Sequence, residues 1–212
     1  MNNIDTERLQ MEKQFPTFPD KSWYEGITLP SSWKLLGDVK DKQILDLGCS
    51  SGWVTWHLLE QGADALATDI FNTYVNRDLP FAYADKENLP FKAKSYDMVV
   101  TANVLHHGDL DKTVQEIHRV LKDGGVFVTL QEPCIDNETS EEEYLKEHLQ
   151  NELSLGIDEH RPSLEKYKKA FSEFKSVEFY IMRDAMFSDK ITDIEPLIIN
   201  SYHGGIAIKA IK

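Results

Sequence analysis

The segment Ile44-Leu45-Asp46-Leu47-Gly48-Cys49-Ser50-Ser51-Gly52-Trp53 constrains the fold of this chain more than any other. It begins as an apolar strand, passes through a turn of small residues, and continues into a stretch that we expect to be helical from about residue 53 to residue 61. Glycine permits a tight turn and a close backbone approach because it has no Cβ atom. A strand that enters a helix through such a turn is typical of a βαβ unit.

The same alternation of apolar runs and amphipathic stretches continues along the chain. We expect strands at residues 43–47, 65–70, 81–85, 96–102, 126–130, 177–182 and 205–211. Connections between the first five strands are long enough for parallel crossovers, whereas no clear helix separates the last two. The pattern therefore predicts an α/β fold with a doubly wound, seven-stranded, mostly parallel sheet and an antiparallel last strand. We expect one domain over residues 1–212, with a helical cap over residues 1–40.

Charge and cysteine content limit the partners of such a domain. Acidic residues number 36 against 23 basic residues, and the net charge of −13 disfavours nucleic acid and anionic membranes as partners. The start of the chain lacks the pattern of a signal peptide, and Cys49 and Cys134 make no disulfide framework, so we expect a cytoplasmic protein, monomeric or homodimeric. The histidines are scattered, and we expect no metal site.

Three interpretations of the turn compete. A dinucleotide-binding turn requires G-x-G-x-x-G, but this chain has Ser50 and Trp53 at the second and third glycine positions. The turn does match G-x-S-x-G, the nucleophile elbow of serine hydrolases, with Ser50 as the nucleophile. However, only one strand precedes this motif, and the oxyanion hole of that architecture needs a loop from an earlier strand. A serine hydrolase therefore stays as an alternative interpretation.

The third interpretation accounts for more of the sequence. Asp46-Leu47-Gly48 and Gly52 are followed by other short motifs in a fixed order: Asp69, Ala84-Asp85, Asn88-Leu89-Pro90-Phe91, Ser95-Tyr96-Asp97, Val104-Leu105-His106-His107, and residues 116–125. Together, over about residues 40–133, they resemble class I S-adenosylmethionine-dependent methyltransferases of the small-molecule, type 11-like branch. The family usually has glycine where this chain has Ser50. The resemblance implies a Rossmann-like fold, with a cofactor-binding half at residues 41–133 and a substrate-side half at 134–212.

The resemblance also implies how S-adenosylmethionine would bind. Carboxylates at the ends of successive strands can accept hydrogen bonds from the donor: Asp69 from the ribose hydroxyls and Asp85 from the adenine amine. Glycines of the turn let the backbone approach the amino-acid end of the donor. The predicted cofactor-binding residues are Asp46, Gly48, Cys49, Ser50, Gly52, Trp53, Asp69, Ile70, Ala84, Asp85, Lys86, Asn103 and Val104. The capping of helices is the alternative role for each aspartate.

Methyl transfer by an in-line SN2 displacement needs mainly alignment, and a general base is optional. Histidine titrates near neutral pH, so we expect His107, or less favoured His106, to act as a base if one is used. Predicted acceptor-binding residues are Trp23, Tyr24, Glu132, His160, Arg161 and His203.

The acceptor itself stays open, as does the choice among O-, N- and C-methylation. Thr101-Ala102-Asn103-Val104 stands where methylases of adenine or amide nitrogens typically carry an Asn/Asp-Pro-Pro-aromatic element. This difference favours a small molecule, with a sugar or a secondary metabolite as our guess. A non-catalytic, methyltransferase-like binding module is a further alternative, for which Ser50 in place of glycine is the only indication.

Overall fold

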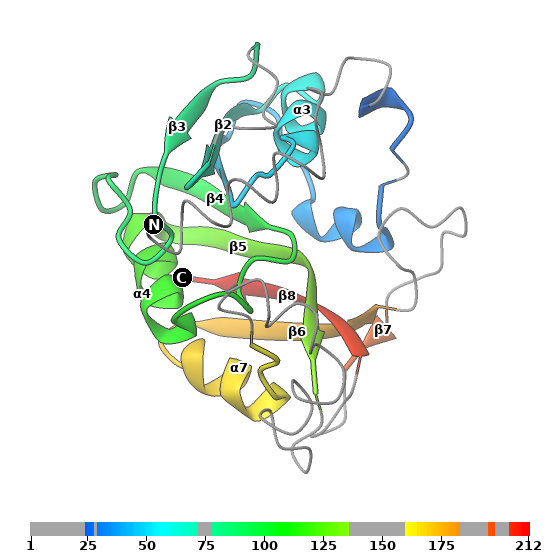
Figure 1. Cartoon of the computed structure of the whole chain (residues 1–212), viewed down its shortest axis with the longest axis vertical. Helices are drawn as coiled ribbons and strands as arrows, with labels where there is room; N and C mark the ends of the chain where they lie inside the picture. Colours follow the sequence, from blue (N-terminus) through cyan, green and yellow to red (C-terminus); the bar gives the residue numbers. More distant parts are fainter. Residues whose placement is uncertain (1–23, 28, 72–77, 136–159, 183–194, 198–203) are drawn as a thin grey trace, which may run out of the picture.

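The computed structural model describes residues 24–27, 29–71, 78–135, 160–182, 195–197 and 204–212 (Figure 1). In chain order its elements are the 3-10 helix η1 (Ser31–Leu36), β1 (Gln43–Leu47), α3 (Trp53–Glu60), β2 (Asp64–Asp69), β3 (Phe81–Tyr83), β4 (Tyr96–Thr101), α4 (Leu110–Val120), β5 (Leu121–Cys134), α7 (Leu164–Ala170), β6 (Ser176–Met182), β7 (Glu195–Pro196) and β8 (Gly204–Ile211).

The strands form a single sheet in the order β3-β2-β1-β4-β5-β8-β6-β7. The first five strands in this order are parallel, and β8 runs antiparallel between β5 and β6. This arrangement confirms the α/β class, the parallel first half and the antiparallel last strand. It adds one strand to the seven predicted, because the two-residue β7 pairs with Tyr180 and Ile181 at the edge.

Other sequence predictions differ from the structure. The helical cap over residues 1–40 is not shown: the described part of this segment contains a short helical turn at residues 24–25 and η1. The acidic segment Ser140–Glu143, whose composition also predicts the start of a helix, lies outside the described residues. Strand β5 is longer than predicted at both ends, because it begins directly after α4 and continues along β8 to Cys134.

The two faces of the sheet bury separate apolar clusters. Neighbouring residues of a strand point to opposite faces, and β1 shows the consequence. Ile44 packs with α3 and η1 on one face, whereas Leu45 and Leu47 pack with α4 and α7 on the other. Because both faces are covered by helices, the loops at the carboxyl ends of β1, β2, β3 and β4 are left to form a binding site.

Candidate functional site

The turn between β1 and α3 has the backbone that a glycine-rich loop would have. Gly48, Ser50 and Gly52 all have positive φ angles, of 72°, 47° and 81°. The N–H groups of Gly48 and Cys49 both donate to the carbonyl of Thr68, at 2.8 and 2.9 Å, which holds the turn against the end of β2. Ser50 thus keeps the left-handed conformation that glycine adopts at no steric cost, although a side chain disfavours it.

Asp46 lies beneath this turn and not at its open side. Its side chain is buried, and Oδ2 accepts hydrogen bonds from both the N–H and the Oγ1 hydroxyl of Thr55, at 3.0 and 2.6 Å. Gly52, the N-cap residue of α3, has no side chain to cap that helix, and Asp46 satisfies one of its first N–H groups instead. The predicted cofactor-binding residue Asp46 therefore directs its carboxylate to α3 and supports the turn from below. Burial raises the pKa of its carboxyl to about 7, despite the opposing hydrogen bonds from Thr55.

Asp69 is the last residue of β2, and Asp85 lies two residues after β3, which ends at Tyr83 and not at residue 85 as predicted. Both follow the carboxyl ends of their strands. Asp69 is half-buried, and its two oxygens accept hydrogen bonds from the N–H groups of Ser50 and Phe71, at 2.9 and 3.2 Å. Burial raises its pKa above the ordinary value for aspartate. Asp85 is exposed, and its Oδ1 accepts from the N–H of Glu87 at 2.9 Å. Each carboxylate keeps acceptor capacity beyond these bonds, since a carboxylate offers about four lone-pair sites.

Several other predicted cofactor residues surround these two carboxylates. The side chain of Ile70, next to Asp69, is 40% exposed, which provides an apolar surface at the site. Lys86 lies close enough to Asp69 to favour its ionised form, and its Nζ is 3.6 Å from Glu87 Oε1. Asn103 has a φ of 58° and is half-buried. Buried side chains belong to Cys49, Trp53, Ala84 and Val104, which leaves chiefly their backbone groups for a ligand.

A buried carboxylate–imidazole pair stands next to the turn. Nδ1 of His106 is 2.9 Å from Oε2 of Glu132. The other oxygen of Glu132 accepts from the N–H groups of Val104 and Leu105, at 2.8 and 3.0 Å, and from the Thr129 hydroxyl at 3.2 Å.

Burial opposes the ionisation of Glu132, but the hydrogen bond and the charge of His106, together with the two N–H groups, outweigh it and hold the pKa of Glu132 below its usual range. Glu132, which the sequence predicted as an acceptor contact, is fully enclosed in this structure, and its side chain holds the loop after β4. His107 is half-buried, with its ring centroid 4.0 Å from that of His106.

The remaining predicted acceptor residues separate into three groups. Tyr24 is fully buried, stacks on Trp56 at 5.5 Å and donates to the carbonyl of Ser51 at 2.6 Å, so its side chain anchors the turn. His160 does reach the site: its N–H donates to the His106 carbonyl at 2.7 Å. The Arg161 side chain bonds back to the carbonyl of His160. Trp23 and His203 lie outside the described residues.

Sequence reasoning missed two positioning devices. One is Thr55, whose hydrogen bonds to Asp46 are described above. The other is a clamp on the loop after β3, in which Glu116 accepts from the N–H of Leu89, and Arg119 pairs with Glu116 and donates to the carbonyls of Leu89 and Phe91. Both partners of the clamp lie in the quoted motif of residues 116–125, but the sequence gives no indication of what they contact.

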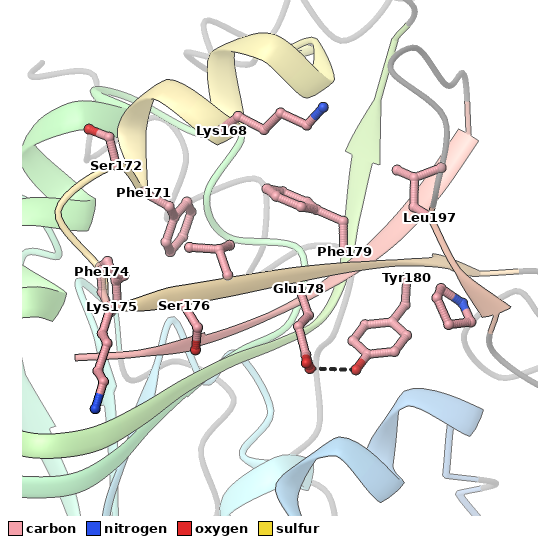
Figure 2. A pocket seen from close by; sticks show the side chains of 12 residues that line it. Lys168, Phe171, Ser172, Phe174, Lys175, Ser176, Glu178, Phe179, Tyr180 and Leu197 are labelled. Atoms are coloured by element: carbon pink, nitrogen blue, oxygen red, sulfur yellow. Dashed lines mark hydrogen bonds between the residues drawn. The ribbon is translucent and has the colours of Figure 1, made fainter.

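A groove of about 600 Å³ lies at the other end of the sheet, between α7, β6 and β7 (Figure 2). Phe171, Phe179 and Leu197 contribute apolar surface, and Lys168 and Lys175 contribute charge. None of the predicted site residues lines this groove. In the strand order, β4, β5 and β8 separate β6 from β1 and β2, whose carboxyl ends carry the candidate site. The groove is therefore not part of the candidate site.

Three further properties bear on the site. The described part of the chain holds no group of three or more His, Cys, Asp or Glu side chains placed to share a metal ion. Within the same residues, no helix has both the length and the apolar character that a membrane span requires. Cys49 and Cys134 are both buried and are not joined in a disulfide, as predicted.

The sequence is similar to known proteins over part of its length. Residues 45–129 match the family described as "Methyltransferase domain". The mitochondrial arginine-hydroxylase NDUFAF5 of Rattus norvegicus is 37% identical over 92 residues, which cover 40% of this chain and 27% of that protein. The tRNA U34 carboxymethyltransferase of Nautilia profundicola is 24% identical over 126 residues, which cover 52% of this chain and 41% of that protein. The chain therefore matches less than half the length of these curated relatives.

Solved structures resemble the whole fold. A SAM-dependent methyltransferase of Thermotoga maritima has a TM-score of 0.64 at 15% identity, and the match covers 100% of both chains. A methyltransferase complex with the Trm112 activator from Haloferax volcanii gives a TM-score of 0.65 at 20% identity, covering 99% of this chain and 97% of that chain. At such low identities the likeness concerns the fold, and it confirms the class I arrangement predicted from the sequence.

Proposed function

We propose that this chain, whose residues 45–129 belong to the methyltransferase domain family, transfers a methyl group from S-adenosylmethionine to a small-molecule acceptor. The family and the class I fold imply S-adenosylmethionine as the cofactor. When bound, the sulfonium of this cofactor supplies an electrophilic methyl group for in-line displacement. The observation that carries the proposal is the pair Asp69 and Asp85, which stand at neighbouring strand ends beside the left-handed turn.

The chemistry of these groups fits the donor. Asp69 keeps acceptor capacity for two ribose hydroxyls, and Asp85 for an exocyclic adenine amine, because backbone N–H groups occupy only part of each carboxylate. The exposed side chain of Ile70 offers an apolar surface for the adenosine. We assign the ribose to Asp69, the adenine to Asp85 with Lys86 and Ala84 beside it, and the amino-acid end to the turn formed by Gly48, Cys49, Ser50 and Gly52. Asp46, Trp53, Asn103 and Val104 support this surface from beneath.

The acceptor side of the proposal rests on the loop after β4. His106, His107 and His160 come together there, and these residues are our candidates for contact with the acceptor, with Arg161 at the margin. The acidic net charge of −13 supports a small molecule over a polynucleotide. Because one relative is named as a tRNA enzyme, the test includes tRNA among its acceptors. The buried thiols of Cys49 and Cys134 are consistent with the cytoplasm as the proposed compartment.

Two alternative activities, a serine hydrolase and an arginine hydroxylase, are supported to different degrees. The serine hydrolase interpretation loses its basis, because the methyltransferase family match includes the Ser50 turn itself. Hydroxylation of arginine is named for a relative that is 37% identical over 92 residues, so the reaction type needs its own test.

Calorimetric titration of the full chain with S-adenosylhomocysteine tests the donor site. Asp69→Asn keeps the size of the side chain but removes its charge, and we expect binding to weaken at least about tenfold, since hydrogen bonds to charged groups contribute about 1.5–3 kcal/mol. Asp64→Asn is the matched control, because Asp64 is an exposed aspartate at the opposite end of the same strand. Undetectable binding by the wild-type chain, or equal loss in both variants, would reject the donor site.

Transfer of a labelled methyl group then tests the reaction. Incubation with methyl-labelled S-adenosylmethionine and a panel of sugars, phenols, amines and tRNA is expected to label a small molecule. Label in tRNA alone would overturn the small-molecule assignment. Arginine peptides are assayed in parallel for oxidation of the side chain, which tests hydroxylation separately. Binding of the donor without label in any acceptor, and without oxidised arginine, would favour the non-catalytic module.

A further inference from the structure

We infer that His106, held by Glu132, is the proton acceptor for the methyl-transfer reaction and that the acceptor group is a hydroxyl. This inference rests on the proposed function and assigns the base to the histidine that the sequence disfavoured. Three observations carry it: the contact between the two side chains, the enclosure of Glu132, and the proximity of this pair to the donor turn.

The contact fixes the tautomer of the imidazole. Glu132 is ionised and cannot donate, so the nitrogen of His106 that faces it at 2.9 Å carries the proton. With Nδ1 protonated, the lone pair of the neutral ring is on Nε2. A carboxylate that orients an imidazole and stabilises its protonated form is the arrangement by which a histidine serves as a general base.

The enclosure of Glu132 shows why this carboxylate stays charged and rigid. Its side chain is fully buried, yet it receives hydrogen bonds from Val104, Leu105, Thr129 and His106. A buried anion without such donors would be strongly unfavourable. Glu132 from β5 and His107 from the same loop contact the imidazole of His106, and the N–H of His160, in the segment before α7, donates to the His106 backbone carbonyl.

The loop that carries His106 contacts the donor turn directly. Side-chain atoms of Val104 lie where a Cβ atom of Gly48 would be, and the N–H of Val104 donates to Glu132. His106 follows two residues later, so the imidazole and the turn are joined through one short, hydrogen-bonded loop. This loop brings the proposed base to the methyl-donor side of the sheet edge.

Charge balance explains the need for the pair. As the acceptor O–CH3 bond forms, the S–CH3 bond breaks and its electron pair stays on sulfur. The hydroxyl proton passes to Nε2 of His106, so the positive charge of the sulfonium ends on the imidazole ring. The carboxylate of Glu132, which contacts this ring, stabilises the positive charge. A hydroxyl needs such a proton acceptor because it is a poor nucleophile while protonated, whereas a tertiary amine has no proton to lose.

Nitrogen NMR of the full chain tests the arrangement without any acceptor. Spectra at about pH 8.5, well above the ordinary imidazole pKa, are expected to show the His106 proton on Nδ1. In Glu132→Gln the amide N–H₂ can face Nδ1 while its oxygen keeps the loop N–H groups, so the proton should move to Nε2. His118→Asn serves as the assignment control. A proton on Nε2 in the wild type, or no change in Glu132→Gln, would overturn the inference.

The structure of the complex with S-adenosylmethionine is the second test. A proton acceptor must be within roughly 6 Å of the methyl carbon, because the attacking oxygen lies about 3 Å from the methyl group and its O–H donates to the acceptor across about 2.8 Å. Nε2 of His106 is expected in this range, on the side away from sulfur. A donor bound at Asp69 with Nε2 beyond this range would refute the inference while leaving the proposed function intact. A donor that does not bind would reject the proposed function first.

Acceptor pairs that differ only by a hydroxyl or an amine give the third test. We expect methylation of the hydroxyl members, a loss of about 100-fold or more in kcat for His106→Gln, and a smaller loss for His107→Gln. Glu132→Gln should lower kcat with little change in KM, since Glu132 positions the base and does not contact the acceptor. Methylation of the amine members alone, or a larger loss in His107→Gln than in His106→Gln, contradicts the assignment.

Discussion

The side chain of Val104 fills the space that a side chain at Gly48 would need: a Cβ atom built on Gly48 would lie 2.6 Å from Cγ2 of Val104 and 2.9 Å from Cγ1. This packing joins the turn after β1 to the loop after β4, which are far apart in the sequence. It makes Gly48 a position where glycine is required both for its backbone and for its lack of a side chain.

Gly48→Ala should therefore lower the free energy of unfolding by about 2–4 kcal/mol, from the left-handed backbone and the overlap with Val104 together. Gly124→Ala is the matched control, because Gly124 has a similar φ of 77° but nothing within 4 Å of its Cβ position. The control should lose only about 1 kcal/mol. Denaturant titration measures both, and equal losses would show that the Val104 contact does not matter. In the Gly48→Ala background, Val104→Ala should recover part of the loss.

Asp46 predicts a pH dependence of stability. Its pKa rises from 3.8 to about 7 on folding, because the folded chain buries it. An acid whose folded pKa is raised stabilises the fold at low pH, and this contribution is lost as the pH rises. Between about pH 4 and pH 7 Asp46 should lower the free energy of unfolding by about 1.4 kcal/mol per pH unit.

Asp46→Asn removes this titration while retaining an oxygen for Thr55. We measure the free energy of unfolding by denaturant titration at several pH values. Between about pH 4 and pH 7 its dependence on pH should be weaker in Asp46→Asn than in the wild type by the contribution of about one bound proton. Because the buried amide has its own cost, the test is the slope and not the absolute stability. Parallel curves for the two proteins would show that the carboxyl of Asp46 titrates normally.

Ser50→Gly should stabilise the chain. Ser50 has a φ of 47°, which costs a non-glycine residue roughly 1–2 kcal/mol, whereas glycine loses roughly 0.5–1 kcal/mol of backbone entropy on folding. The expected net gain is up to about 1 kcal/mol, read from a thermal or denaturant midpoint. Ser51→Gly, next in the chain and without a positive φ, should instead lose stability. A loss in Ser50→Gly equal to that in Ser51→Gly would contradict this account.

Arg119→Lys tests the clamp on the loop that follows β3. A lysine cannot bond Glu116, Leu89 and Phe91 together as the guanidinium does, so about 1–2 kcal/mol of stability should be lost. Amide exchange of residues 85–91 should increase, and S-adenosylhomocysteine should bind several-fold more weakly, because Asp85 belongs to this loop. Lys94→Ala, which breaks only an exposed ion pair with Asp123, should leave both unchanged. Unchanged amide exchange in Arg119→Lys would show that other contacts, and not this clamp, keep the loop ordered.

The positions of the parallel strands along the chain, and of the turn, followed from local patterns. Ile44 to Leu47 read as a strand because apolar residues there fit a sheet buried on both faces. The spacing of Val114, Ile117 and Leu121 likewise indicates the apolar face of α4. Strand β7 escaped prediction because two residues carry no periodicity. Its existence depends on the edge of β6.

The sequence by itself determined the class of the fold, the strand–turn–helix unit, and the two aspartates that lie at the end of β2 and just after β3, since each is specified by residues adjacent in the chain. Only the tertiary structure decided the burial and the hydrogen-bond partners of side chains that contact residues distant in the sequence. Asp46 is enclosed because α3 turns back to place Thr55 against it, and Glu132 selects His106 over His107 because β5 runs alongside β4. Burial and pairing across strands are properties of the folded sheet, and residue types and spacings cannot express them.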